Sequence, residues 1–388
     1  MFVHQLKAKR VLLFFSLTRE QVLRENSTLE LEMFLSESRF PFHEQSDIYI
    51  VLSRFPMIAI RNRNKSRRLI TMTYLGLFLR VCSIRNLAQL VWWVRNDQRD
   101  EQGASRSRLY SFLIELEERI IDASVKGILS ESDSSLQLVT TQSYISKRPR
   151  FMKERKERCE RFMIWYSTNS VPILRRGDKS QRYLPEALED YYDYHFVWDE
   201  YQAHELKSQG IWKTEVKGSM IFVSQSRKED HYSLNQRSVV IFDVTPYCPS
   251  IGYYSREICE GNLRMMISAC EEASTHLDYR IPVLLKPKRR YSNRSDSDYK
   301  TYVENLSKAG IIEMLEPSAN LYQVIEMSAA VISVPFTSPA IMAKEMNVPS
   351  VFAAIDSDEW MIPKEHHGLP VLRSQHTLAT WLINQMKG

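Results

Sequence analysis

The residues of this chain whose types suit chemistry gather in its second half, directly after short apolar runs. Asp243 ends the run Val239–Phe242, and a carboxylate there can act as a nucleophile or stabilise an oxocarbenium-like centre. Thr337, Ser338 and Pro339 follow another apolar run and have the composition of a helix start. Backbone N–H groups at a helix start attract phosphate. These segments predict a site for a phosphorylated ligand beside a reactive carboxylate.

Each of these segments also has a purely structural explanation. Asp243 can accept a local hydrogen bond from Thr245 in an Asx-type turn, and Ser338 can simply cap its helix. The basic turn that begins at Lys286 can be solvated surface. The sequence leaves both explanations open at each position.

Further polar residues follow the expected strands and are candidates for ligand contacts. Basic side chains there can neutralise a phosphate or carboxylate, and arginine can make two parallel hydrogen bonds. The candidate donor-site residues are Lys286, Lys288, Arg289, Glu316, Asn320, Ser333, Thr337, Ser338 and Glu345. In the first half the candidates are Glu200 or Asp199 as acid–base residue, and Thr168, Asn169 and Ser170 as acceptor contacts. Either acidic residue can instead start a helix that runs through Glu205.

The second half alternates apolar runs with helix-like stretches, which is typical of βα units on a parallel sheet. The predicted strands are Ser238–Asp243, Ile281–Leu285, Ile311–Leu315, Ala330–Val334 and Ser350–Ala353. The predicted helices are Tyr254–Thr275, Asp298–Lys308, Leu321–Met327, Pro339–Met346 and Thr377–Met386. Since ligands bind beyond the carboxyl ends of parallel strands, the polar segments are expected to share one edge.

The first half is less regular. Residues 109–121 have the apolar spacing of an amphipathic helix, and residues 1–100 cannot be assigned to elements. The predicted strands are Leu136–Thr140, Phe162–Tyr166 and Tyr194–Trp198. The turn-like residues 217–219 then precede the regular second half, so we expect a domain boundary near residue 216.

Length and composition fit two globular domains. The chain has 388 residues, of which 44% are hydrophobic and 26% charged. Its 52 basic residues are nearly matched by 47 acidic ones, so no nucleic-acid partner is expected. The longest apolar stretch, Leu69–Leu79, is well short of the roughly 18–20 residues of a membrane span. We expect a cytoplasmic protein that at most attaches to a membrane surface.

Several classes of site lack their sequence signals. The five cysteines are scattered without a CxxC pair, which favours a reducing compartment, and the histidines show no metal-ligand spacing. We therefore expect neither a metal nor another cofactor. No P-loop, GxGxxG or GxSxG motif is present, which argues against a kinase, a dehydrogenase and an α/β-hydrolase.

Two stretches resemble a known family. Residues 328–339 read SAAVISVPFTSP and residues 347–352 read NVPSVF, which is similar to the C-terminal signature of bacterial surface-carbohydrate glycosyltransferases with a GT-B fold. Within that group the sequence looks most like the retaining β-Kdo transferases of O-antigen and capsule assembly. Residues 195–202, HFVWDEYQ, resemble the end of the acceptor domain in such enzymes. The resemblance covers residues 160–370.

The resemblance implies an α/β, GT-B-like fold, in which two Rossmann-like domains have parallel sheets that face a central cleft. Residues 1–215 would be the N-terminal acceptor-binding domain, and residues 216–388 would bind the nucleotide-sugar donor. The donor would be CMP-β-Kdo, which is a substrate and not a cofactor. The acceptor would be a glycan or lipid-linked glycan of a surface polysaccharide, reached from the inner face of the cytoplasmic membrane.

The resemblance also implies roles for individual residues. Asp243 would match the carboxylate that forms a covalent Kdo adduct before transfer with retention. Thr337 and Ser338 would contact the CMP phosphate, and Lys286 and Lys288 would bind the charged groups of the donor. Two alternatives stay open: another nucleotide sugar, such as a uridine-linked hexose, and a non-catalytic domain that binds glycan or acts as a scaffold.

Overall fold

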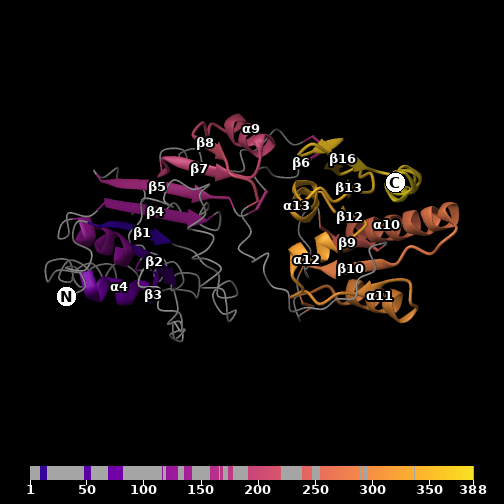
Figure 1. Ribbon diagram of the computed structural model, residues 1–388, viewed down its shortest axis with the longest axis horizontal. Coiled ribbons are helices and arrows are strands. Elements are labelled where there is room, and N and C mark those ends of the chain that lie inside the picture. The colour runs from indigo at the N-terminus through magenta and orange to yellow at the C-terminus, as the bar shows by residue number, and fades with distance from the viewer. Residues whose placement is uncertain are drawn as a thin grey trace. The chain divides into compact units, whose positions relative to one another are not determined.

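The computed structural model contains two compact units, each with a parallel sheet (Figure 1). It describes residues 9–14, 48–53, 69–81, 116, 119–129, 135–141, 158–165, 167–168, 174–177, 191–219, 238–246, 254–288, 290–291, 295–335 and 337–387. The first unit comprises residues 1–166, 184–198 and 206–222, and the second comprises 167–183, 199–205 and 223–388. The expected boundary near residue 216 lies in the last segment of the first unit, and two earlier segments belong to the second unit.

The N-terminal unit contains a sheet of seven strands in the order β3-β2-β1-β4-β5-β7-β8, with all neighbours parallel. The strands are β1 (Arg10–Phe14), β2 (Ile48–Ser53), β3 (Leu69–Thr73), β4 (Ser135–Thr141), β5 (Cys159–Ile164), β7 (Tyr194–Val197) and β8 (Thr214–Val216). Strands β4, β5 and β7 overlap the three that the sequence predicts. Strands β1 to β3 lie in the stretch that the sequence leaves unassigned.

Two helical segments of the N-terminal unit are described by the structure. Helix α4 (Tyr74–Val81) follows β3, and residues 119–129 are helical. In the latter helix Ile121, Val125 and Ile128 are buried at helical spacing, as an amphipathic helix requires. The predicted helix 109–121 overlaps it at residues 119–121, and most of the rest lies outside the described residues.

The C-terminal unit contains the second seven-stranded sheet, in the order β11-β10-β9-β12-β13-β16-β15. The strands are β9 (Val239–Asp243), β10 (Val283–Pro287), β11 (Glu313–Met314), β12 (Ala330–Ser333), β13 (Ser350–Ala353), β15 (Glu365–His366) and β16 (Leu369–Leu372). All neighbours are parallel except β15 and β16, which form an antiparallel hairpin. A separate antiparallel pair joins β6 (Leu174–Arg175) to β14 (Trp360–Met361).

Five helices complete this unit, at the places that the sequence predicts. They are α10 (Arg256–Leu277), α11 (Ser297–Lys308), α12 (Leu321–Glu326), α13 (Pro339–Glu345) and α14 (Gln375–Met386). Four of them begin with a side chain that accepts a hydrogen bond from the first turn, namely Ser255, Asp296, Asn320 and Ser374. Helix α13 differs, because Ser338 has helical dihedral angles and makes no such bond.

The alternation of side chains gives the C-terminal sheet two distinct faces. Val239 and Ile241 pack with α10, α11 and α14 in one hydrophobic core. Phe242 points to the opposite face, where α13 lies against β12 and β13 and next to α12. Asp243, one residue further, shares the face of α10 and α11. The two parallel α/β sheets confirm the fold class that the sequence predicts.

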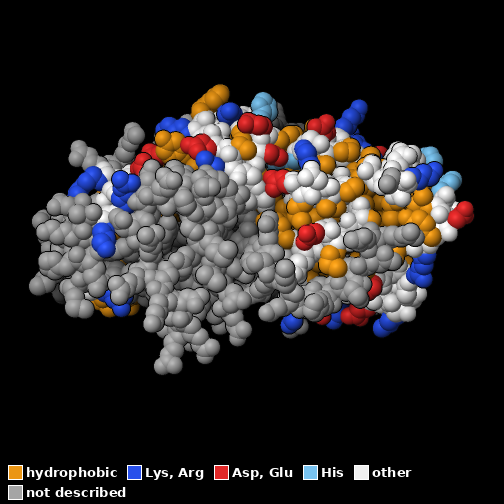
Figure 2. Space-filling view, viewed as in Figure 1, with side chains coloured by type: hydrophobic (Ala, Val, Ile, Leu, Met, Phe, Trp, Pro, Cys, Tyr) orange, Lys and Arg blue, Asp and Glu red, His pale blue; other side chains and the backbone are white. Residues whose placement is uncertain are grey.

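The surface of the C-terminal unit carries both signs of charge. In Figure 2, basic and acidic side chains are interspersed over its visible face, in keeping with the near balance of 52 basic and 47 acidic residues in the chain. Across the part of the chain that the structure describes, no helix has both the length and the apolar character needed to cross a bilayer.

Candidate functional site

The carboxyl ends of β9 and β12 lie side by side, at the point where the winding of the C-terminal sheet reverses. From β9 the chain passes through α10 to β10 and on to β11, and it then returns through α12 to β12 on the other side of β9. In an open α/β sheet, ligands bind beyond the strand ends at this topological switch point. The segments that follow the two strands, 243–246 and 334–338, both contain predicted site residues.

Asp243 is the last residue of β9, and its side chain is only 6% exposed. Its Oδ1 accepts a hydrogen bond from the Tyr299 hydroxyl at 2.8 Å, and its Oδ2 has no hydrogen-bond partner among the described residues. Burial raises the pKa of Asp243 to about 6, although hydrogen bonds from Tyr299 and Val244 act in the opposite direction. The sequence predicts this carboxylate at an opening, whereas the structure buries it with one oxygen unpaired.

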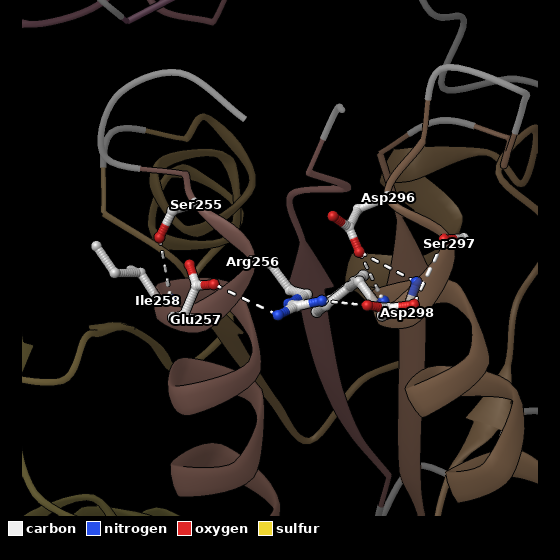
Figure 3. A network of polar contacts seen from close by, with 8 residues as sticks. Ser255, Arg256, Glu257, Ile258, Asp296, Ser297 and Asp298 are labelled. Atoms are coloured by element: carbon white, nitrogen blue, oxygen red, sulfur yellow. Dashed lines mark hydrogen bonds and ion pairs between the residues drawn. The ribbon is translucent and has the colours of Figure 1, made fainter. Parts of the chain in front are cut away.

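The N-terminal ends of α10 and α11 lie side by side (Figure 3), and Tyr299 of α11 donates its hydroxyl proton to Asp243. Arg256, in the first turn of α10, forms ion pairs with Glu257 and with Asp298 of α11. Asp296 caps α11, and its N–H donates to the Pro246 carbonyl oxygen at 3.1 Å. The loop after β9 is therefore fixed to the start of α11, which also carries Tyr299.

The loop after β12 contains the letters PFTS at residues 335–338. The Thr337 hydroxyl donates to the Val334 carbonyl oxygen at 2.6 Å, so its proton is used within the loop. The Ser338 hydroxyl makes no capping hydrogen bond to α13. The structural explanation that the sequence allows for Ser338, simple capping, therefore does not hold.

Lys286 belongs to strand β10, whereas the sequence predicts it in a turn after the strand. Its neighbour in register is Phe242, and the same row continues through Ser333 to Phe352. All four side chains are buried, and Lys286 Nζ donates to the Pro317 carbonyl oxygen at 3.1 Å. Ser333 Oγ has no hydrogen-bond partner in the described part of the chain. Two polar groups thus occupy the face of the sheet opposite Asp243.

The other basic candidates lie beside the end of β10. The Lys288 side chain is exposed, and its backbone N–H donates to the Asp243 carbonyl oxygen at 3.1 Å. Arg289 lies outside the described residues. Lys288 therefore ties the end of β9 to the end of β10 through its backbone.

Three further candidates, Asn320, Glu316 and Glu345, lie in the described part of the C-terminal unit. Asn320 caps α12, with Oδ1 accepting from Tyr322 N–H at 3.0 Å, which makes it a structural residue. Glu316 is exposed and lies 3.9 Å from Arg290. Glu345 is the exposed last residue of α13.

The candidates from the first half are only partly described. Glu200 is exposed and starts helix α9 (Glu200–Ser208). Thr168 is buried and lies in the segment 167–183, which belongs to the second unit. Asn169 and Ser170 lie outside the described residues.

A pair formed by the partly exposed Asp199 and the buried His367 is the main feature that the sequence does not predict. Asp199 Oδ2 lies 2.7 Å from His367 Nδ1, and the His367 side chain is fully buried. The ring centroid of His367 lies 4.7 Å from that of Tyr201 and 4.4 Å from that of His366. Helix α9 is thereby attached to the hairpin of β15 and β16.

The electrostatics of this pair differ from those of Asp243. Burial acts to raise the pKa of Asp199, but the hydrogen bond and charge of His367, the Gln202 N–H and Lys344 outweigh it, so the pKa lies below its ordinary value. Burial lowers the pKa of His366 to about 3, with the neighbouring His367 as the second cause. Asp199 is therefore kept as a carboxylate, and His366 stays neutral.

The backbone at His367 is unusual for its residue type. His367 and Gly368 form the two-residue turn of the hairpin, with φ angles of 53° and 68°. Such turns favour asparagine, aspartate or glycine, because both residues have positive φ. Gly368 is the local turn signal, whereas the partner of His367 is 168 residues away in the sequence.

Together these groups offer a defined set of chemical functions at one sheet edge. Asp243 supplies a carboxylate with an unpaired oxygen, and Ser338 supplies a hydroxyl that is not used in capping. Lys286 adds a buried positive charge on the other face. A carboxylate, a hydroxyl and a lysine are the residue types that can contact a charged or polar ligand.

Comparison with solved structures identifies the fold. A UDP-GlcNAc 2-epimerase from Methanocaldococcus jannaschii has a TM-score of 0.51 and 9% identity, covering 98% of this chain and 92% of that chain. An E. coli trehalose-6-phosphate structure bound with UDP-2-fluoro glucose has a TM-score of 0.51 and 10% identity, covering 97% of this chain and 91% of that chain. At these identities the likeness shows the fold alone, which is GT-B-like.

Comparison of the sequence identifies the family. No curated protein matches the chain. The family described as "Polysaccharide biosynthesis PFTS motif protein" matches residues 118–382, which is well over half of the chain and includes the loop after β12. The chain therefore belongs to the polysaccharide biosynthesis PFTS motif proteins and has a GT-B-like fold.

Proposed function

We propose that this protein is a glycosyltransferase that moves a sugar from a nucleotide-sugar donor to a growing polysaccharide. The observation that carries the proposal is the position of the PFTS loop and Asp243 at adjacent strand ends of one switch point. Family membership in polysaccharide biosynthesis supports the class of product. The acceptor is a glycan or lipid-linked glycan, and transfer takes place in the cytoplasm at the inner face of the membrane.

The finer proposal is a retaining transfer of Kdo from CMP-β-Kdo, based on the resemblance of residues 328–339. Asp243 Oδ2 attacks the anomeric carbon, an ester bond forms, and the bond from that carbon to the phosphate oxygen breaks with release of CMP. The acceptor hydroxyl oxygen then attacks the same carbon, and the ester bond breaks to regenerate the carboxylate. The proton of the acceptor passes to a general base, for which Glu200 is the candidate.

The contacts of individual residues limit which of them can bind the phosphate. Thr337 already donates its hydroxyl proton to Val334, so Ser338 is the better hydroxyl donor of the loop. Lys288 is exposed and can meet a charged group of the donor, whereas Lys286 is buried. We therefore propose that Ser338 contacts the phosphate and that Lys288 contacts another charged group of the donor.

A different donor is the second candidate. The two fold relatives are named for UDP-GlcNAc or bound with UDP-2-fluoro glucose, so a uridine-linked sugar is the natural comparison. The catalytic arrangement at Asp243 would be unchanged, and only the nucleoside contacts would differ.

A thermal-shift panel of CMP, UMP, UDP and GDP tests the donor class. A nucleotide that binds only the folded state stabilises it by about 2.7 kcal/mol at a hundredfold excess over its Kd. We expect CMP to raise the Tm most. A larger shift with UDP would replace CMP-Kdo by a uridine-linked donor, and no shift with any nucleotide would favour a glycan-binding scaffold.

Intact-mass analysis with the preferred donor tests the mechanism. We expect the wild-type protein to gain the mass of one sugar residue, and Asp243→Asn to gain none and to lose transfer by about a thousandfold or more. The Asn variant should still show the nucleotide thermal shift. Full transfer activity in that variant would remove Asp243 from the mechanism. Assays with and without a chelator test the expected independence from metal.

A pair of cap variants tests the phosphate contact at Ser338. Ser338→Ala should weaken nucleotide binding with little loss of stability, since this hydroxyl makes no cap bond. Ser374→Ala is the matched control, because the Ser374 hydroxyl caps α14 and accepts a hydrogen bond from Thr377 N–H at 3.3 Å. The control should lose about 1 kcal/mol of stability. Unchanged nucleotide affinity in Ser338→Ala would contradict the assignment.

A further inference from the structure

The carboxyl group of Asp243 has two oxygens with different surroundings. Oδ1 accepts from the Tyr299 hydroxyl at 2.8 Å, while Oδ2 is buried without a partner among the described residues. Buried polar atoms in folded proteins are nearly always hydrogen-bonded, so an unpaired carboxylate oxygen at a ligand-binding edge suggests a place for a ligand atom. One oxygen is thus held and the other is available.

Core packing and a backbone hydrogen bond hold Tyr299 in place. Its side chain is fully buried in the core formed by α10, α11 and α14, and its ring lies 6.4 Å from that of Tyr302. Its backbone N–H donates to Asp296 Oδ1 at 3.0 Å in the first turn of α11. Asp296 N–H in turn holds Pro246 in the loop that follows β9. The hydroxyl and the carboxyl group are therefore held by the same short structural unit.

The other groups near Asp243 do not replace this hydrogen bond. The Tyr291 hydroxyl is buried and has no partner among the described residues, although the charge of Asp243 contributes to raising its pKa. Cys259 of α10 has a raised pKa, chiefly from burial and then from Asp243, so the thiol stays protonated. Asp296 and Glu257 also contribute to raising the pKa of the Cys259 thiol. The basic group at these helix ends, Arg256, forms ion pairs with Glu257 and Asp298. Tyr299 is the described side chain that favours the ionised form.

We propose that Tyr299 is the positioning residue of this site: its hydroxyl fixes the plane of the Asp243 carboxyl group, favours the carboxylate, and leaves Oδ2 to meet the substrate. The role of Tyr299 in catalysis rests on the proposed function, in which Asp243 Oδ2 is the nucleophile. When Oδ2 forms the glycosyl ester, Oδ1 becomes the carbonyl oxygen and keeps its hydrogen bond. Tyr299 retains its proton throughout, and stabilises the carboxylate again when the acceptor displaces it.

The test compares Tyr299→Phe with Tyr302→Phe, which makes the same change on the same helix. The ionisation of Asp243 is followed by carboxyl ¹³C NMR of aspartate-labelled protein, with its signal assigned by Asp243→Asn. Because the lost hydrogen bond favours the charged form, Tyr299→Phe should raise the pKa of Asp243 by about one unit, a tenfold change in its ionisation constant. Tyr302→Phe should leave it unchanged. No shift in Tyr299→Phe, or an equal shift in both variants, would overturn the proposal.

The activity arm separates this inference from the proposed function. In Tyr299→Phe the acidic limb of the pH–rate profile should move upward by the same amount as the NMR pKa, with partial recovery of the rate at higher pH. If Asp243→Asn stays fully active, the nucleophile assignment fails, and the NMR comparison still decides the role of Tyr299. If Tyr299→Phe does not fold, 3-fluorotyrosine at position 299 keeps the shape and is a stronger donor. It should lower the pKa of Asp243, and a pKa that stays unchanged would equally overturn the proposal.

Discussion

Asp243 and Asp199, two carboxylates of the C-terminal unit, have opposite surroundings. Asp243 has a neutral tyrosine as its hydrogen-bond donor, and burial raises its pKa to about 6. Asp199 is bonded to His367, and its pKa lies below the ordinary value although burial acts against this. Each lies at or just after the carboxyl end of a strand, β9 or β7. Strand-end position alone therefore does not set the pKa of a carboxylate. Burial decides its direction at Asp243, whereas the charged and hydrogen-bonding partners decide it at Asp199.

The difference separates a structural from a reactive role. A carboxylate held by a histidine, with its second oxygen bonded to the Gln202 N–H at 2.9 Å, has both oxygens in use. Asp243 has one oxygen without a hydrogen-bond partner among the described residues, and its pKa of about 6 is close to neutral pH. This difference agrees with an anchoring role for Asp199 at helix α9 and with the proposed role of Asp243 as nucleophile.

The largest expected effect on stability is that of Asp199→Ala. The change leaves the buried Nδ1–H of His367 without an acceptor and removes the bond that caps α9 at Gln202. These two losses together should lower the free energy of unfolding by about 2–4 kcal/mol. Urea unfolding followed by circular dichroism measures the change.

Asp199→Asn is the control for this prediction, because it keeps an acceptor for His367 and should lose less than half as much. The pH dependence supplies a second check. Since the folded pKa of Asp199 is lowered, its contribution is present above the unfolded pKa of about 3.8 and is lost as the pH falls toward the folded value. Equal losses in the Ala and Asn variants would show that the pair does not anchor α9.

Asp243→Asn should have the opposite effect and stabilise the protein near neutral pH. The folded pKa of about 6 exceeds the ordinary 3.8, so the folded state binds more protons than the unfolded state between these values. The contribution of Asp243 to stability therefore falls as pH rises through this window. Asparagine does not ionise, so the Asn variant should be more stable than wild type by about 1–3 kcal/mol near neutral pH.

Unfolding of wild type and Asp243→Asn at several pH values measures this difference. The gain should shrink toward about pH 4, where Asp243 is protonated in the folded state. A gain that does not depend on pH would show that burial of the charge is not its cause.

The sequence predicted the elements of the C-terminal unit well because their signals are local. Strands β12 (AVIS) and β13 (SVFA) are mostly apolar, and all their residues are buried as a parallel sheet requires. The starts of α11 and α12 follow Asp296 and Asn320, which are favoured caps. Strand β16 was missed, since Leu369–Leu372 contains a proline and begins at a hairpin turn.

The candidate site was predicted only as an edge of the sheet, not as a set of contacts. Asp243 and Ser338 were found because each directly follows an apolar run. Tyr299, the partner of Asp243, was read only as part of a helical face, since nothing local links residues 56 apart in the chain. The apolar run ends at Leu285, so the sequence predicts Lys286 in the turn that follows, yet register places it inside β10.

The smallest expected effect, that of Gly368→Ala, tests whether the turn at His367 holds the pair with Asp199. Gly368 has a φ of 68°, and an added Cβ would lie 2.6 Å from Lys344 Nζ. Gly310→Ala is the matched control, with a φ of 65° and open space around the added atom. Each variant should lose about 1 kcal/mol from backbone strain alone.

Of the two variants, only Gly368→Ala should change the pKa of Asp199. Lys344 Nζ donates to the His367 carbonyl oxygen at 2.8 Å and also helps to lower the pKa of Asp199. Displacing this ammonium group should therefore raise the pKa of Asp199 toward its ordinary value, as measured by carboxyl NMR, while Gly310→Ala leaves it unchanged. If both variants leave the pKa of Asp199 unchanged, the contrast between the two carboxylates depends on the His367 ring alone and not on the turn that carries it.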